Sequence, residues 1–355
     1  ALAGCAQVAT QPPTQPSTSS NADAVQADAA QATAAHFDAI RHSPPQLEAF
    51  LRAMPKGADL HNHLSGAIDA EDLLNWAAQD GFCIERATDT AVVPPCDAAQ
   101  GRPLAAAAFG DDALYRQVID AWSMRDFVPG SGESGHDHFF DTFGKFHLVT
   151  RAHRGDMLAR AVHQAAHDRE VYIELMDTLA EAQLRSLVAR TPWDGDVAHA
   201  HAALQPGMPA ILAQAKNELD SAQRQMREEL RCGSAQADPG CDVEVRFLYQ
   251  VLRGFPAQRV FAQMLTGFEL ATSDARVVGI NMVMPEYGYL SMRDFREQSE
   301  MLDYLHAQFP QVHISLHAGE LSSTLVPPDG LRFHIRASIE QGHAQRIGHG
   351  VDVMH

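Results

Sequence analysis

The sequence predicts an α/β protein built as a (β/α)8 TIM barrel, with about six of the eight strands inside these 355 residues. Short segments rich in Val, Ile and Leu alternate with amphipathic helical segments over most of the chain. This alternation is typical of βα units around a parallel sheet. Polar and histidine side chains follow the carboxyl ends of several of these strands, which favours a barrel over an open sheet.

Each element follows from the spacing of its apolar residues. Leu47, Phe50 and Leu51 recur at helical intervals after a Pro-Pro pair and predict a helix over residues 47–54. A strand then carries the run that contains two histidines, at positions 61 and 63. The same reasoning predicts strands at residues 170–176, 242–252, 277–284, 313–320 and 346–353, helices at 70–79, 111–122, 139–146, 157–169, 179–190, 209–232, 257–272, 292–308 and 330–341, and loops at 83–110 and 130–135.

Charge and composition exclude some classes of function. The formal net charge is −18, from 27 Lys and Arg against 45 Asp and Glu. Because such a surface repels phosphates, we expect no nucleic-acid partner. The 45% hydrophobic content is enough for a sizeable core, and no apolar run is long enough for a transmembrane helix.

The first residues resemble an export signal. Leu2-Ala3-Gly4-Cys5 is similar to the cleavage box of bacterial lipoproteins, in which the cysteine is lipidated. Residues 6–35 are rich in Ala, Gln, Ser, Thr and Pro and predict a flexible tether. We therefore expect a lipidated, disordered region over residues 1–35, a barrel domain over 36–355, and a periplasmic protein anchored to a bacterial membrane at Cys5. The alternative is a disordered leader with an accidental cysteine.

The other four cysteines fit an exported protein. An even number of cysteines in an oxidising compartment suggests disulfides. The local pairings are Cys83 with Cys96 and Cys232 with Cys241, and the alternative is reduced, buried thiols.

Two histidines on one strand could be half of a metal site. His61 and His63 are one residue apart, so a strand turns both side chains to the same face. With 19 histidines in the chain, about one such pair is expected by chance, and two others occur, at 136/138 and 199/201. The pair at 61/63 is the one on a predicted strand.

Three further residues extend this pattern. His317 lies near the end of a predicted strand, and Glu320 follows it after a glycine. His349 lies on the next strand between two glycines. Three histidines at strand ends could hold zinc, and a nearby carboxylic acid that is not a ligand could transfer a proton.

At this point the chain resembles the adenosine deaminase family, in particular its secreted, growth-factor-like branch and bacterial relatives. The similarity covers about residues 54–353. It rests on the stretches MPKGADLHNHLSGA, FFDTFGKF, VYIEL, VVGINMVMPE, SLHAGE and RIGHG.

The resemblance implies a (β/α)8 barrel with one catalytic zinc ion. By resemblance, His61, His63 and His317 are the metal ligands, although an all-histidine set also suits iron, nickel or cobalt. Glu320 is the acid that protonates the purine ring nitrogen. His349 orients the attacking water and helps to deprotonate it.

The resemblance also implies the substrate-binding residues and two departures. Phe143 and Phe146 belong to a segment that covers the purine, or equally to a helix that faces the core. Met284 stands where relatives have a glycine that lets the backbone approach the purine. The family also has a paired Asp after the eighth strand, so we expect this sequence to be part of a longer protein.

These features lead to one main functional hypothesis and two alternatives. The main one is zinc-dependent deamination of adenosine or a related aminopurine nucleoside, a small-molecule partner. The first alternative is a metal hydrolase of the same superfamily acting on another amine or amide. The second is a lipid-anchored binding protein without catalysis. The sequence does not indicate an oligomeric state.

Overall fold

The computed structural model describes residues 19–130, 132–351 and 353, so the lipidation site expected at Cys5 lies outside the described residues. The chain divides into two compact units, Ala1–Pro55 and Lys56–His355. In its described part the first unit consists of helix α1 (Ser19–Ile40) and helix α2 (Pro44–Ala53). Helix α1 occupies much of the expected tether because alanine, the strongest helix former, dominates it. The division falls after residue 55, and residue 36, where the barrel domain was expected to begin, lies within α1.

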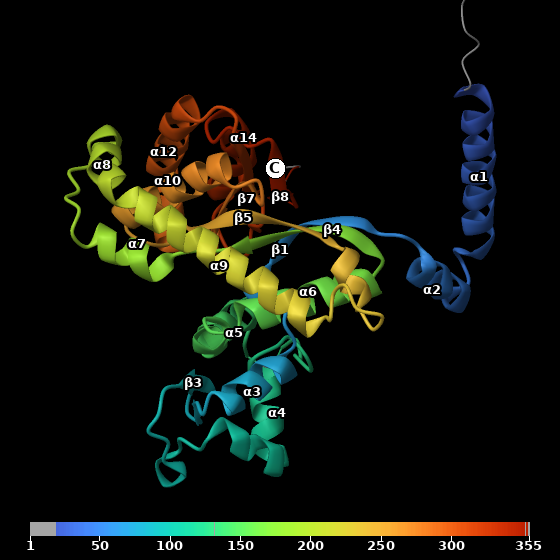
Figure 1. Cartoon of the computed structure of the whole chain (residues 1–355), viewed down its shortest axis with the longest axis horizontal. Helices are drawn as coiled ribbons and strands as arrows, with labels where there is room; N and C mark the ends of the chain where they lie inside the picture. The colour runs from blue at the N-terminus through green and yellow to red at the C-terminus, as the bar shows by residue number, and fades with distance from the viewer. Residues whose placement is uncertain (1–18, 131, 352, 354–355) are drawn as a thin grey trace, which may run out of the picture. The chain divides into compact units, whose positions relative to one another are not determined.

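The second unit is a partial (β/α) barrel whose wall is a six-stranded parallel sheet (Figure 1). The strands follow one another in chain order, which confirms the predicted fold class. Gly348 on the last strand lies against the His61 ring on the first, so closely that a Cβ at position 348 would overlap it. The sheet therefore curls until its two edges approach. Its strands are β1 (Gly57–His63), β4 (Glu170–Asp177), β5 (Glu244–Leu252), β6 (Val277–Val283), β7 (His313–Ala318) and β8 (Arg346–His349).

Alternation along β5 shows how the strands separate core from interior. Phe247 and Tyr249 point outward and are fully buried in the main hydrophobic core, against helices such as α10 (Ala257–Ser273). Leu248 points the other way and packs in a small cluster with Met176. Because side chains alternate along a strand, the polar residue at position 250 also faces the barrel interior.

Helices cover the outside of the sheet and extend beyond it (Figure 1). Most of them match the predicted ranges to within a few residues, and helix 197–204 lies in a region without a predicted element. They are α3 (Ala70–Gln79), α4 (Asp112–Ala121), α5 (Gly135–Thr150), α6 (Arg154–His167), α7 (Glu181–Val188), α8 (Val197–Leu204), α9 (Met208–Glu229), α11 (Tyr289–Arg293), α12 (Phe295–Gln308), α13 (Pro328–Leu331) and α14 (His334–Glu340).

The predicted loop at 83–110 contains a small antiparallel hairpin, β2 (Cys83–Glu85) with β3 (Thr90–Val92). Its strands have three residues each, too few for a period-2 pattern to stand out in the sequence. Both local disulfide pairings are confirmed. The Cα atoms of Cys83 and Cys96 are 5.4 Å apart, and those of Cys232 and Cys241 are 5.5 Å apart. Within the described part of the chain, no helix has the length and apolar character needed to cross a bilayer.

Candidate metal centre

Strand β1 carries the first two histidines of the site. The pairing of β1 with β4 is irregular between Asp59 and Asn62, and the Asp59 carboxylate supports the irregular backbone. It accepts the backbone N–H of His61 at 3.0 Å and the side-chain amide of Asn62 at 2.8 Å. The rings of His61 and His63 are perpendicular, with centroids 5.8 Å apart. Both rings line the same cavity.

Strands β7 and β8 bring two more imidazoles to this point. The ring centroids of His317 and His349 lie 4.5 Å and 4.9 Å from that of His61. One ring nitrogen from each of these three residues lies within 4.8 Å of the other two. His349 has a left-handed backbone, with φ of +75°, and its neighbour Gly350 donates its N–H to the carbonyl oxygen of Ala318.

Hydrogen bonds to the amide oxygens of two neighbouring side chains orient His63 and His317. The Nδ1 atom of His63 lies 3.0 Å from the amide oxygen of Gln250, and that of His317 lies 2.7 Å from the amide oxygen of Asn281. An amide oxygen accepts, so each Nδ1 atom carries the proton and each Nε2 atom presents a lone pair. These two Nε2 atoms are 3.1 Å apart. Two lone pairs this close call for a shared cation or proton.

The protonation states suit metal ligation. Burial lowers the pKa of His61 to about 4, with the nearby His349 and His63 adding to the effect. Burial also lowers the pKa of His63 and, together with the positive charge of Arg253, that of His317. Neutral imidazoles are the form that binds metals.

The ring nitrogens of His61 are both buried and lack a hydrogen-bond partner within the described residues. Orphaned nitrogens, neutral rings and facing lone pairs fit a metal ion, and imidazole nitrogens are ordinary zinc ligands. The cluster can hold one metal ion, and zinc fits its donors. All four imidazoles adjoin this site. One nitrogen each from His61, His317 and His349 lies within 4.8 Å of the other two, and the Nε2 atoms of His63 and His317 are 3.1 Å apart. His63 contacts this group of three through its close approach to His317.

Glu320 lies beside this cluster, as the sequence predicted. One of its carboxylate oxygens is 3.8 Å from the Nε2 atom of His349, and each side chain is about a quarter exposed, at 27% and 29%. Burial raises the pKa of Glu320, and the Glu286 carboxylate adds to the rise, while His349 opposes it. A carboxylic acid with a raised pKa can hold a proton and donate it.

A cavity of about 570 Å³ opens over the histidines and Glu320. Its volume is within the range of small-molecule sites. Helix α5 supplies an aromatic wall of four phenylalanines. Phe143 packs edge-to-face on Phe139 with centroids 5.3 Å apart, and the buried Phe146 packs on Phe143 at 5.7 Å. The predicted substrate-binding residues Phe143 and Phe146 therefore lie in the same cavity as the predicted metal and proton-transfer groups.

Met284 also lines the cavity, just after β6. Its backbone has φ of +85°, a conformation that favours glycine. Its side chain lies over Gly254, where a Cβ would be 2.8 Å from the Met284 methyl carbon. Position 284 thus keeps the backbone conformation of a glycine while a bulky side chain occupies the wall.

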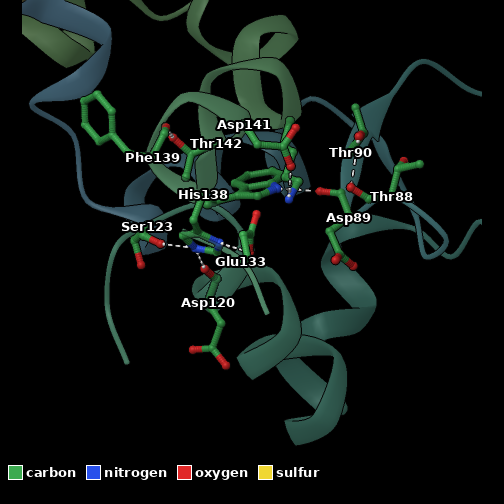
Figure 2. Close-up of polar contacts among 12 residues, drawn as sticks. Thr88, Asp89, Thr90, Asp120, Ser123, Glu133, His138, Phe139, Asp141 and Thr142 are labelled. Carbon is green, nitrogen blue, oxygen red and sulfur yellow. Dashed lines mark hydrogen bonds and ion pairs between the residues drawn. The ribbon is translucent and has the colours of Figure 1, made fainter. Parts of the chain in front are cut away.

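The start of α5 is fixed by His138 (Figure 2). The Nδ1 atom of His138 lies 3.0 Å from the Glu133 carboxylate, and its Nε2 atom lies 3.0 Å from the carbonyl oxygens of both Asp120 and Ser123. All three partners are acceptors, so the protonated imidazole satisfies them together. This contact ties the helix that carries the aromatic wall to the end of α4.

Sequence reasoning missed the two amides that orient the histidines, Gln250 and Asn281. Asn281 also accepts the backbone N–H of His317 at 3.2 Å. The sequence did contain a signal for these two amides, since both are polar residues at inward-facing positions of otherwise apolar strands. A buried polar group requires a hydrogen-bond partner, so such a residue points to a neighbour that it binds. The partners themselves depend on how neighbouring strands pair.

Comparison with known proteins gives matches among solved structures. No protein-family model and no curated protein matches the sequence. A zinc-bound COG1816 amidohydrolase from Burkholderia ambifaria is 17% identical, with a TM-score of 0.44 over 87% of this chain and 62% of that chain. An adenine deaminase from Arthrobacter aurescens is 16% identical, with a TM-score of 0.46 over 85% and 66%. An Arabidopsis N6-mAMP deaminase is 18% identical, with a TM-score of 0.48 over 86% and 70%. This chain spans less than two thirds of the first two.

Proposed function

We propose that this protein is a zinc-dependent aminohydrolase that deaminates adenosine or a related aminopurine nucleoside to an inosine-type product and ammonia. One observation carries the proposal: Glu320, an acid with a raised pKa, lies 3.8 Å from His349 at the edge of the histidine cluster in one cavity. Deamination of a purine needs this combination, because the attacking water loses both of its protons overall while the ring nitrogen and the leaving amine each gain one.

Each group has a defined part in the proposed reaction. A bound zinc ion supplies the Lewis acidity that makes water nucleophilic at neutral pH. Glu320 holds the proton that it gives to the ring nitrogen beside the reacting carbon. His349 takes a proton from the attacking water and passes it to the amine, which leaves as ammonia, while the second proton of that water returns to Glu320. Phe143 and Phe146 offer apolar faces to the purine and exclude bulk water.

The cavity favours a substrate without a phosphate. None of the described residues that line it is Lys or Arg. A buried phosphate needs cationic or N–H donors, so we expect a nucleoside or base to be preferred over a nucleotide.

A substrate panel tests the proposal. The full-length, zinc-loaded protein is incubated with adenosine, adenine, AMP and an aryl amide, and ammonia release is measured. The proposal expects release from adenosine and loss of turnover in the E320Q variant, which keeps the size of the side chain but not the acid. Release from the amide alone would contradict it.

One observation favours a different amine or amide substrate. The Met284 side chain narrows the cavity at a position where members of the adenosine deaminase family have a glycine. A preference for the aryl amide in the panel would support this alternative. The third hypothesis, a binding protein without catalysis, requires that the wild type and E320Q bind adenosine equally and that neither releases ammonia.

The metal content of single variants separates ligands from proton carriers. In the proposal His63 is a ligand and His349 acts on water. Substitution H63N should therefore lower bound zinc strongly, whereas H349N should retain zinc and lose turnover. Zinc loss in H349N, with retention in H63N, would assign His349 as the ligand instead.

We also propose export and a lipid anchor at Cys5. The Leu-Ala-Gly-Cys stretch supports this, and the two disulfides fit an oxidising compartment. Metabolic labelling with a radioactive fatty acid should label the wild-type protein and leave C5A unlabelled. Equal labelling of both would refute it.

A further inference from the structure

The turn that carries Glu320 is held by a buried carboxylate from another strand. Glu286 follows β6 and is 1% exposed. Its carboxylate oxygens accept the backbone N–H of Gly319 at 3.2 Å and that of Glu320 at 2.9 Å. Gly319 has φ of +74°, and a Cβ there would meet the methyl carbon of Ile335 at 2.7 Å. The turn is therefore tightly packed, and one carboxylate accepts both of its N–H groups.

A buried histidine completes the arrangement. The Nδ1 atom of His334, on α14, lies 2.7 Å from the Glu286 carboxylate, and both side chains are 1% exposed. The His334 ring stacks on Phe295 with centroids 4.7 Å apart and an angle of 11°. Burial alone would raise the pKa of Glu286, but the hydrogen bond from His334 and the charge of Arg253 bring it below its usual value. Glu286 therefore stays ionised and accepts from all three donors.

A second buried residue fixes the strands on either side of this turn. The guanidinium of Arg253 is fully buried and donates to the carbonyl oxygens of Met282 at 2.8 Å and His317 at 3.0 Å. It therefore joins the ends of β6 and β7, from which Glu286 and Glu320 follow. Charged hydrogen bonds at buried positions are the strongest type, so this connection is rigid.

We infer that Glu286, held in place by His334, is a positioning residue that fixes the Gly319–Glu320 backbone so that the Glu320 carboxyl faces the histidine cluster. Glu286 does not line the cavity, so it acts through Glu320 rather than on the substrate. The effect on turnover rests on the proposed function, whereas the effect on the turn does not.

Substitution E286Q reduces the number of hydrogen-bond acceptors at this position while it keeps the size of the side chain. A glutamine has one carbonyl oxygen, and its NH2 group donates rather than accepts. Whichever way the amide is turned, the NH2 group faces a backbone N–H of the turn, that of Gly319 or that of Glu320. At least one of the two hydrogen bonds is lost without creating a cavity.

His334 offers a matched pair of substitutions. The amide nitrogen of asparagine reaches the position of the imidazole Nδ1 atom, whereas the longer glutamine places its nitrogen near the Nε2 position. Substitution H334N should therefore retain the hydrogen bond to Glu286, and H334Q should lose it.

The test combines amide hydrogen exchange, zinc content and kinetics on the full-length, zinc-loaded protein. E286Q and H334Q should speed exchange in the peptide around Gly319 and Glu320 at least tenfold, with unchanged zinc. With adenosine, kcat should fall about 10²-fold, the effect of misplacing a catalytic group by about 1 Å, while KM changes less than threefold. H334N should stay within about fivefold of the wild type.

The matched control is D156N. Asp156 lies on α6 and does not line the cavity. Its carboxylate is hydrogen-bonded to another histidine, with 2.6 Å between its oxygen and the Nδ1 atom of His153. D156N should leave exchange in the turn and kcat unchanged. Unchanged exchange in both E286Q and H334Q would overturn the inference, as would equal loss of kcat in H334N and H334Q. If the wild type does not turn over adenosine, the proposed function fails, and hydrogen exchange alone decides whether Glu286 holds the turn.

Discussion

Replacing Met284 by glycine or alanine tests its backbone conformation and its place in the cavity wall. A left-handed backbone costs a residue with a Cβ about 1–2 kcal/mol, and glycine does not incur this cost. In ordinary helix or strand interiors, glycine is instead about 0.5–1 kcal/mol less stable than alanine. Because φ is +85° at position 284, we expect the normal order to reverse.

The expected magnitudes follow from the half-buried state of Met284. Truncation of a fully buried methionine to alanine costs about 2–5 kcal/mol. For a half-buried one we expect about 1–2 kcal/mol in M284A, and M284G should be more stable than M284A by about 1 kcal/mol. Urea unfolding measures both values. An M284A variant at least as stable as M284G would refute the left-handed backbone.

The same two variants test the cavity. Removal of the side chain that lies over Gly254 widens the space beside the histidines. If Met284 obstructs a purine, M284G should raise kcat/KM for adenosine at least fivefold while zinc content stays constant. A decrease would show that Met284 contacts the substrate productively.

Three other predictions concern stability. Removal of zinc by a chelator should lower the free energy of unfolding of the wild type by about 2.7 kcal/mol, compared with the same protein in free zinc at 100 times Kd. The same treatment should leave the free energy of unfolding of an H61N/H317N variant unchanged. Loss of the Cys232–Cys241 disulfide, which spans nine positions, should lower the free energy of unfolding by about 2.5 kcal/mol on the loop-entropy relation. Urea unfolding of the double alanine variant in oxidising buffer measures this loss. It would show no change if the bond does not form in the protein. Burial alone would lower the pKa of His138, but hydrogen bonds to Glu133 and to backbone carbonyls raise it. The stabilisation from His138 should therefore be complete below its unfolded pKa of about 6.5 and disappear as the pH rises through the folded pKa. The free energies of unfolding of H138Q and the wild type should differ at pH 5.5 and converge at pH 9. A constant difference would contradict the protonated imidazole.

Much of the fold could be predicted because parallel βα units have a strong local pattern. Each buried strand is a short apolar run, and each covering helix has one apolar face. The features that sequence reasoning did not predict are those without such a pattern. The β2–β3 hairpin has three-residue strands, and α1 is Ala-rich in a segment whose polar composition suggested a tether.

The sequence predicted that the site residues meet in one place but not how they are arranged there. His61, His63, His317, Glu320 and His349 all line one cavity, as expected from their places at strand ends. Which nitrogens come closest depends on the curl of the sheet between its first and last strands. Strand pairing and ring orientation set this, and neither can be read from residue spacing.

The most direct test of the central claim is the ultraviolet spectrum of adenosine incubated with the zinc-loaded, full-length protein and with its E320Q variant. We expect the wild type to convert the spectrum to that of inosine, and E320Q to leave it unchanged while binding the same amount of zinc. Conversion by E320Q at the wild-type rate would contradict the role of Glu320, and no conversion by either protein would contradict adenosine as the substrate.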